Sequence, residues 1–260
     1  MIESRFKWAD AFVLEFSAAK EFYENLFGWS FFPQHAEHGV MYSLACLDGN
    51  ANPPESTVVA GLAECADAQR KMNYWNSYVT VASVDDAVGR VQDANGSVYM
   101  EPMDVMTAGR MAVCADDQGV VFHLWEAIDH SGSQISNRPN SICWYELAVS
   151  DLSKAVQFYG TVFSWSVSYR EMSSGKYALF KSNGNLVCGA HDQLSQTNGV
   201  ECWLPYFQTE DLNNSLNVCK THKGTVICEV LEEAEIGRYA IAADCENNMF
   251  GLVEFRNAAK

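Results

Sequence analysis

The sequence has no closely spaced pair of cysteines, although it contains nine cysteines in 260 residues. They are scattered along the chain, and no two of them form a C-x-x-C motif. An odd number of dispersed cysteines argues against a disulfide framework and against a zinc site built from thiolates. We therefore expect small, buried, free thiols of the kind found in a reducing compartment.

Positive charge is also scarce, because 17 Lys and Arg residues stand against 33 Asp and Glu residues, a formal net charge of -16. Such a chain repels phosphate backbones and anionic lipid surfaces. No run reaches the roughly 18 apolar residues that a membrane span needs, and residues 1–8 are not followed by the apolar stretch of a signal peptide. We expect a cytoplasmic protein that binds neither nucleic acid nor membrane.

The composition is otherwise that of an ordinary folded protein, with 48% hydrophobic and 19% charged residues. A chain of this length fits two domains of average size. The linker-like composition of residues 127–140 separates residues 1–130 from residues 139–260, with the boundary near Ser133. These two segments are the predicted domains.

The two segments are copies of one sequence. Shifted by 136 positions, the stretch from Trp8 to Trp29 matches the stretch from Trp144 to Trp165 without a gap, and with a shift of 128 positions residues 75–126 match residues 203–254. The change of shift fits an insertion at residues 52–55 of the first copy. Identical pairs include Phe22/Phe158, Tyr23/Tyr159, Tyr78/Tyr206, Gly109/Gly237, Arg110/Arg238 and Asp116/Asp244.

Each copy reads as two units of strand, helix and three strands. In the first unit, residues 8–16 predict a strand and residues 18–27 a helix, with Ser17 as N-cap and Gly28 as its stop, followed by strands at 29–32, 40–47 and 57–63. The second unit predicts a strand at 75–81, a helix at 84–94 and strands at 98–101, 109–115 and 120–125, with a hairpin turn at 116–119. The second copy repeats both units from residues 142 and 202. An α+β fold of four βαβββ modules is therefore expected.

Three stretches resemble one protein family. Residues 146–165 (ELAVSDLSKAVQFYGTVFSW) resemble the first strand and helix of a module of the vicinal-oxygen-chelate (glyoxalase/bleomycin-resistance/dioxygenase) superfamily, and residues 22–29 (FYENLFGW) resemble the end of that helix. Residues 109–125, with Asp-Asp-Gln-Gly before a final strand, resemble the closing hairpin of the same module. The resemblance implies that paired modules form two glyoxalase-like open-barrel domains, each curling its strands around a cavity.

The resemblance also implies where a divalent metal would bind, since members of the family use a His or Gln on the opening strand and a Glu on the closing strand. The corresponding opening positions are Trp8, Asn76, Trp144 and Leu204, and the closing positions are His123 and Gly251. Only the histidine is a good metal ligand among these six. We therefore expect no metal cofactor, whereas the alternative of a bound divalent metal requires Asp10 or another carboxylate to join His123.

Residues that share strand parity with those positions should face the cavities. As ligand-binding residues this selects Trp8, Asn76, Tyr78, Trp125, Trp144 and Tyr206. Asp10 and Glu146 are carboxylates that are costly to bury without a partner, and His123 could act with Asp10 as acid and base, so these three are the candidate catalytic residues. The repeated Arg110 and Arg238 are expected to be structural, with acidic partners such as Glu101 and Glu229.

Three functions remain open. The first is a metal-free protein of the bleomycin-resistance type that binds a small, aromatic or apolar molecule. The second is a lyase, isomerase, dioxygenase or hydroxylase-like enzyme that uses a metal at a shifted position or an Asp/His base. The third is a protein whose repeat serves assembly, with both cavities filled by side chains. The expected partner is a small-molecule ligand, and a homodimer is also considered.

Overall fold

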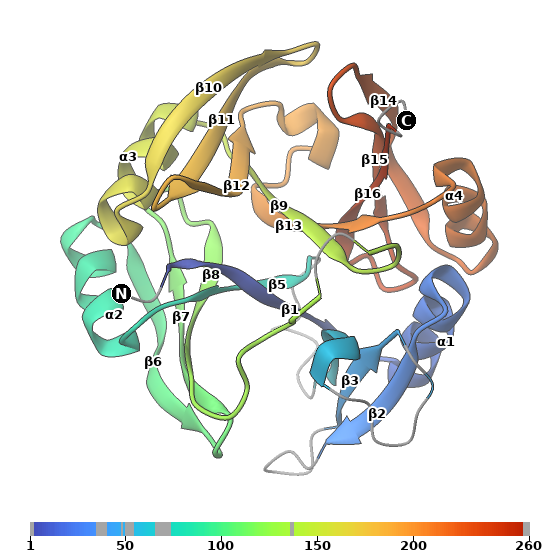
Figure 1. Cartoon of the computed structure of the whole chain (residues 1–260), viewed down its shortest axis with the longest axis horizontal. Coiled ribbons are helices and arrows are strands. Elements are labelled where there is room, and N and C mark those ends of the chain that lie inside the picture. Colours follow the sequence, from blue (N-terminus) through green and yellow to red (C-terminus); the bar gives the residue numbers. More distant parts are fainter. Residues whose placement is uncertain are drawn as a thin grey trace. The chain divides into compact units, whose positions relative to one another are not determined.

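Each copy of the repeat forms one eight-stranded sheet in the computed structural model (Figure 1). The structure describes residues 3–34, 41–47, 49, 55–65, 74–135 and 138–256, so residues 52–54 of the predicted insertion lie outside the described residues. The first sheet has the order β2-β3-β4-β1-β5-β8-β7-β6, and the second has the equivalent order β10-β11-β12-β9-β13-β16-β15-β14.

The elements follow the predicted order. In the first copy they are β1 (Arg5–Val13), α1 (Phe16–Phe27), β2 (Ser30–Gln34), β3 (Tyr42–Cys46), β4 (Val58–Glu64), β5 (Asn76–Thr80), α2 (Val84–Asp93), β6 (Ser97–Val105), β7 (Gly109–Ala115) and β8 (Val121–Ala127). In the second they are β9 (Ile142–Ala148), α3 (Leu152–Phe163), β10 (Ser166–Met172), β11 (Gly175–Ser182), β12 (Asn185–His191), β13 (Cys202–Gln208), α4 (Leu212–Thr221), β14 (Thr225–Glu233), β15 (Gly237–Ala243) and β16 (Met249–Phe255). The predicted α+β fold of four βαβββ modules is confirmed.

The opening strand of each module pairs in parallel with the closing strand of the same module. Asp10 on β1 lies opposite Gly61 on β4, and Tyr78 on β5 lies opposite His123 on β8. In the second copy Glu146 lies opposite Gly189 and Tyr206 lies opposite Gly251. In every module, the same opening-strand position therefore lies opposite the same closing-strand position, in the middle of the sheet.

The start of α1 corrects one sequence prediction. Ser17 is not the N-cap, because the helix begins at Phe16 and Glu15 occupies the capping position without a side-chain cap. The carboxylate of Glu246 accepts hydrogen bonds from the backbone N–H groups of Leu14 and Glu15, both at 2.7 Å. The acceptor for these N–H groups is therefore Glu246, which is distant in the sequence, and not the neighbouring Ser17 that the sequence predicts. The predicted stop is confirmed, since Gly28 adopts a left-handed conformation with φ of 68°.

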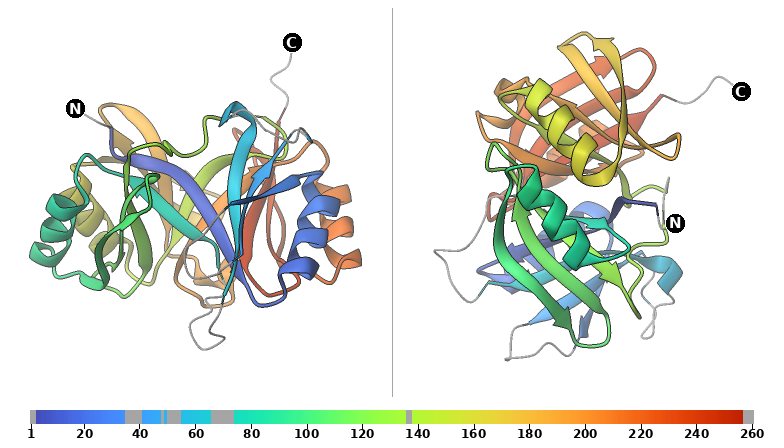
Figure 2. Two further views of the ribbon diagram at one scale, coloured as in Figure 1. Left: turned by 90° about the horizontal axis from the view of Figure 1, so that it is seen from below. Right: turned by 90° about the vertical axis from the view of Figure 1, so that its left-hand side faces the viewer.

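The chain divides into two compact units that combine modules from both copies. Unit 1 comprises residues 1–8, 76–132 and 145–203, and unit 2 comprises residues 9–75, 133–144 and 204–260. Within unit 1, α2 packs against α3, and within unit 2, α1 packs against α4 (Figure 2). Each helix therefore packs against a helix from the other copy.

A buried hydrogen-bond network repeats in each unit. In unit 2 the hydroxyl of Tyr23 donates to Oδ2 of Asp244 at 2.7 Å and accepts from Nε1 of Trp75 at 3.1 Å. In unit 1 Tyr159, Asp116 and Trp203 make the equivalent contacts at 3.0 and 2.9 Å. The aspartate of each closing hairpin is therefore held by a tyrosine from a helix of the other copy.

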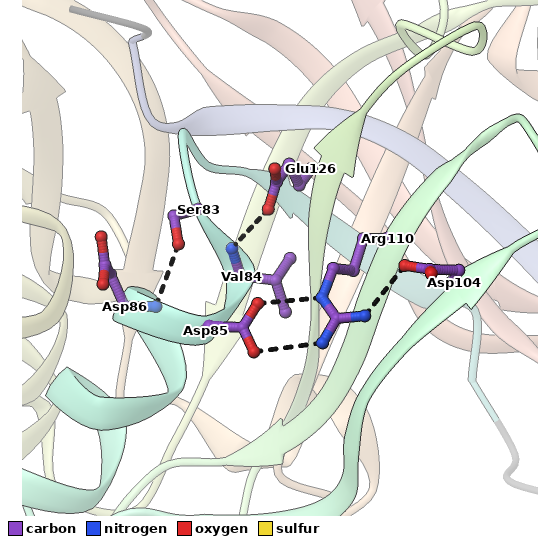
Figure 3. Close-up of polar contacts among 7 residues, drawn as sticks. All are labelled: Ser83, Val84, Asp85, Asp86, Asp104, Arg110 and Glu126. Atoms are coloured by element: carbon purple, nitrogen blue, oxygen red, sulfur yellow. Dashed lines mark hydrogen bonds and ion pairs between the residues drawn. The ribbon is translucent and has the colours of Figure 1, made fainter.

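The repeated arginines have different partners from those expected. Nε and Nη2 of Arg110 donate to the two carboxylate oxygens of Asp85 at 2.9 and 3.1 Å, and Nη1 donates to Asp104 at 2.8 Å (Figure 3). Arg238 donates to Glu254 and Asn213. These are surface contacts that connect the helix after the opening strand with the closing hairpin, so the prediction of Glu101 and Glu229 as partners was wrong.

All nine cysteines are free thiols, as the sequence predicts. Four of them are partly exposed and five are buried. Within the described residues, no helix has the length and apolar character needed to cross a membrane.

Candidate functional site

An aromatic cluster occupies the face of β5 and β8 in unit 1. The rings of Tyr78 and His123 lie 4.6 Å apart at 35°, and Trp125 stands edge-on to Tyr78 at 6.4 Å. These three residues share the face because strand positions two apart point the same way. Three of the predicted site residues are therefore brought together by the pairing of the opening and closing strands.

The same cluster extends to β1 through His130. The indole of Trp8 packs edge-on against the ring of His130 at 4.5 Å, and Nε1 of Trp125 donates to the backbone oxygen of His130 at 2.8 Å. Trp8 and Trp125 are both buried. Trp8, Tyr78, His123, Trp125 and His130 are called the aromatic cluster below.

His123 is the polar centre of the aromatic cluster. Its side chain is buried, and burial lowers its pKa from 6.5 to about 3, so the imidazole is neutral near pH 7. Nδ1 has no hydrogen-bond partner among the described residues, and the same holds for the buried Oγ1 of Thr80, which lies on the same face. Unsatisfied buried polar atoms are rare and costly, so this face offers hydrogen bonds that a bound molecule can complete.

A second cluster forms around Glu146 on β9. Oε2 of Glu146 accepts a hydrogen bond from the Tyr177 hydroxyl at 2.6 Å, and Oε1 lies 3.3 Å from Nε2 of His191. All three side chains are buried. Burial alone lowers the pKa of His191, but the Glu146 carboxylate and Asp192 outweigh it and raise the pKa overall.

A glycine makes the contact between Tyr177 and Glu146 possible. A Cβ atom on Gly189 of β12 would overlap the hydroxyl and ring atoms of Tyr177, so glycine leaves the space in which the tyrosine crosses that strand. The first copy has the same arrangement, because Tyr42 donates to Asp10 at 3.3 Å and a Cβ atom on Gly61 would overlap the hydroxyl of Tyr42.

The two copies differ at the histidine. His191 lies two residues after Gly189, and the equivalent residue of β4, two after Gly61, is Ala63. Among the described residues, only the second copy therefore combines a carboxylate, a phenol and an imidazole at these positions.

The other predicted residues are placed as follows. Asn76 and Trp144 are half-buried, and Tyr206 is buried over Gly251, with its ring 6.4 Å from that of Tyr239. Asp10 belongs to unit 2 and His123 to unit 1, so their pairing as acid and base stays a prediction.

The residues at the metal positions do not fit a divalent ion. Three of the four opening positions carry carbon-only or indole side chains, and the register adds Gly61 and Gly189 to Gly251 as closing positions without a ligand. His123 is the one imidazole in the set. Across the described part of the chain, no three His, Cys, Asp or Glu side chains lie together in a way that could hold a metal. A divalent metal ion of the kind that the family binds requires a group of oxygen and nitrogen donors.

Sequence reasoning missed Thr80, Tyr177, His191 and the two glycines that admit the tyrosines. Gly61 and Gly189 are related by the same shift of 128 positions that the repeat reveals, so they could have been found. His191 could not, because it has no counterpart in the first copy.

Comparisons with known proteins agree with this architecture. Residues 5–124 match the model of the Glyoxalase/Bleomycin resistance protein/Dioxygenase superfamily. The chain is 29% identical over 249 residues to CFP32 of Mycobacterium tuberculosis (strain CDC 1551 / Oshkosh), a protein named as a candidate glyoxylase, with 95% of this chain and 93% of that protein covered. It is 26% identical over 265 residues to the anthracycline biosynthesis protein DauV of Streptomyces sp. (strain C5), with 96% and 93% covered.

Among solved structures, the Mn(II)-bound glyoxalase of Novosphingobium aromaticivorans is similar in fold, with a TM-score of 0.64 and 13% identity over 97% of this chain and 83% of that chain. Residues 5–124 of this chain are therefore similar to the Glyoxalase/Bleomycin resistance protein/Dioxygenase superfamily, and the second copy repeats the same pair of modules.

Proposed function

We propose that this protein binds a small, uncharged aromatic molecule without a metal ion, and that the aromatic cluster of unit 1 is the binding site. The observation that carries the proposal is the buried Nδ1 of His123, which has no hydrogen-bond partner among the described residues, in a ring that lies against the tilted ring of Tyr78. A neutral imidazole can donate one hydrogen bond and accept another, which suits a phenol or a carbonyl rather than a charged group.

The aromatic side chains support the same class of ligand. Ligand sites commonly combine apolar and aromatic walls with a few polar atoms that fix orientation, and here Tyr78, Trp8 and Trp125 accompany His123 and Thr80. The relative DauV is named for anthracycline biosynthesis, and an oxygenated fused-ring aromatic compound fits this chemistry. The metal-free character rests on the unsuitable side chains at the family's ligand positions.

Binding of 2-hydroxyanthraquinone tests the proposal. In this probe the hydroxyl group is not adjacent to either carbonyl. The hydroxyl and a carbonyl therefore cannot chelate a metal ion together. We expect saturable quenching of tryptophan fluorescence by wild-type protein. His123→Leu should weaken binding about tenfold, since one hydrogen bond is lost.

The exposed Tyr99 on β6 provides a matched control, because Tyr99→Ser changes an aromatic residue outside the aromatic cluster. Its affinity should equal that of wild type. Equal affinities for wild type and His123→Leu contradict the proposed site.

A further inference from the structure

Two buried polar atoms on the face of β5 and β8 have no hydrogen-bond partner among the described residues. They are Nδ1 of His123 and Oγ1 of Thr80, and only 6% and 7% of the surfaces of these two residues are exposed. The hydroxyl of Ser77 on β5 is in the same condition, but strand alternation places Ser77 on the other face of the sheet. A molecule bound at this face therefore meets two unsatisfied groups.

The strand pairing fixes the distance between these two groups. Thr80 lies opposite Trp125, two residues beyond the pair of Tyr78 and His123, so the Cα atoms of Thr80 and His123 are about 8 Å apart. Both polar atoms lie within two bonds of Cβ, and side chains stand roughly perpendicular to a sheet, so this separation is kept. One ligand atom can span at most about 6 Å with two hydrogen bonds. A ligand that satisfies both groups therefore needs two polar atoms.

Aromatic residues occupy the other diagonal of the same four positions. The ring of Tyr78 lies 4.6 Å from that of His123, and Trp125 stands edge-on to Tyr78 at 6.4 Å. The surface between the two polar atoms is therefore made of rings. Such a surface suits a planar aromatic body whose polar atoms lie on different edges.

The chemistry of the two groups gives each a different role. Among the described residues, Nδ1 is the only nitrogen of the His123 ring that is fully buried without a partner. A buried N–H group without an acceptor is rarer than a buried acceptor without a donor, so the proton of the neutral ring belongs on Nε2 and Nδ1 is an acceptor. The hydroxyl of Thr80 can donate. The complementary ligand donates to His123 and accepts from Thr80.

We propose that the aromatic cluster selects hydroxyaryl ketones and hydroxyquinones in one orientation, with the ligand hydroxyl donating to Nδ1 of His123 and a ligand carbonyl accepting from the hydroxyl of Thr80. Thr80 is then the residue that distinguishes ligands with a carbonyl from phenols without one. This inference rests on the proposed function, because it concerns the same site. It adds a second polar contact and the direction in which the ligand lies.

Three ligands and two variants test the orientation by titration of tryptophan fluorescence at pH 6. 2-Hydroxyanthraquinone carries both groups, 2-hydroxyanthracene lacks the carbonyls, and 2-methoxyanthraquinone lacks the hydroxyl donor. Thr80→Val should weaken binding of the two quinones about tenfold and leave 2-hydroxyanthracene unchanged. His123→Leu should weaken binding of the two hydroxyl compounds about tenfold and leave 2-methoxyanthraquinone unchanged.

Ser77→Ala is the matched control, because it removes a buried hydroxyl without a hydrogen-bond partner from the opposite face of the same strand. This variant should bind all three ligands with the affinity of wild type. If Thr80→Val fails to fold by circular dichroism, Thr80→Ala replaces it, with the same expected losses.

The outcomes separate this inference from the proposed function. If 2-hydroxyanthraquinone loses affinity in His123→Leu but not in Thr80→Val, the binding site stands and the orientation is overturned. Equal losses for all three ligands in Thr80→Val also overturn the orientation, because the hydroxyl then does not contact a carbonyl. If wild type binds none of the three ligands, the proposed function fails and the orientation fails with it.

Discussion

The two buried histidines of unit 1 lie in opposite electrostatic environments. His123 has aromatic neighbours, and burial lowers its pKa to about 3, whereas His191 faces Glu146 and has a raised pKa despite burial. A histidine with a lowered folded-state pKa destabilises the fold at acid pH, because the unfolded chain takes up the proton first. For a raised pKa the stabilising contribution is present at low pH and is lost as the pH rises through the folded-state value.

His123 therefore predicts a measurable acid destabilisation. Between pH 6.5 and 3 the unfolded state binds a proton that the folded state does not, and at pH 5 this difference costs about 2 kcal/mol of unfolding free energy. The His123→Leu variant lacks this contribution to the pH dependence of the unfolding free energy. Urea denaturation at pH 7.5 and pH 5 should show a smaller loss of stability in the variant than in wild type. Equal losses contradict the assignment of a neutral, buried imidazole.

Single residues could be predicted from the sequence only where the repeat or strand parity identified them. Parity brought Tyr78, His123 and Trp125 together correctly, because pairing of the opening and closing strands places them on one face. His191 depends on a contact between β9 and β12 that no local pattern encodes. The arginine partners were missed for the same reason, since Asp85 lies on a helix and not on the neighbouring strand.

At the scale of elements, β4 and β12 each carry one glycine that lets a tyrosine cross the strand. The tyrosines come from β3 and β11 and reach carboxylates on β1 and β9. Three neighbouring strands are thus connected through side chains as well as through the backbone ladder.

Gly189→Ala should break this connection in the second copy. The added methyl would overlap the Tyr177 hydroxyl, so the ring must move and Glu146 loses that hydrogen bond, at a cost of about 1–3 kcal/mol. Gly89→Ala in α2 is the matched control, because nothing lies within 4 Å of the added atom. That variant should be neutral or up to about 1 kcal/mol more stable, since alanine is the better helix former. Urea denaturation measures both changes, and equal stabilities for the two variants contradict the crossing.

Element order and type followed from periodicity and from the repeat, whereas some element ends did not. The sequence predicts a short strand at 98–101, whereas β6 extends to Val105. The prediction ended too early because Pro102 and Asp104 are residue types that disfavour strands. Those residues are tolerated because β6 is the edge of its sheet.

At the scale of the whole molecule, the hydrogen-bonded sheets follow the two copies, but the compact units do not. Tyr23 of the first copy needs Asp244 of the second, and Tyr159 of the second needs Asp116 of the first. The helix pairs α1/α4 and α2/α3 also join different copies. The sequence repeat could predict two similar copies, but it contains no signal for which modules pack together.

The packing of modules from different copies predicts how separate fragments of the chain behave. Residues 1–130 and residues 139–260, produced separately, should each lack a cooperative unfolding transition, because the tyrosine networks and helix pairs are incomplete. Mixing the fragments should restore a complex and a single transition, which circular dichroism and sedimentation measure. Independent cooperative unfolding of both fragments, without association, contradicts the coupling.

We propose above that a small molecule binds to the aromatic cluster without a metal ion. Calorimetric titration of 2-hydroxyanthraquinone into chelator-treated protein, repeated after addition of Mn(II), tests this proposal. We expect the same Kd in both titrations, because the side chains around His123 supply the contacts. Binding that appears only after Mn(II) is added would rule out a metal-free site.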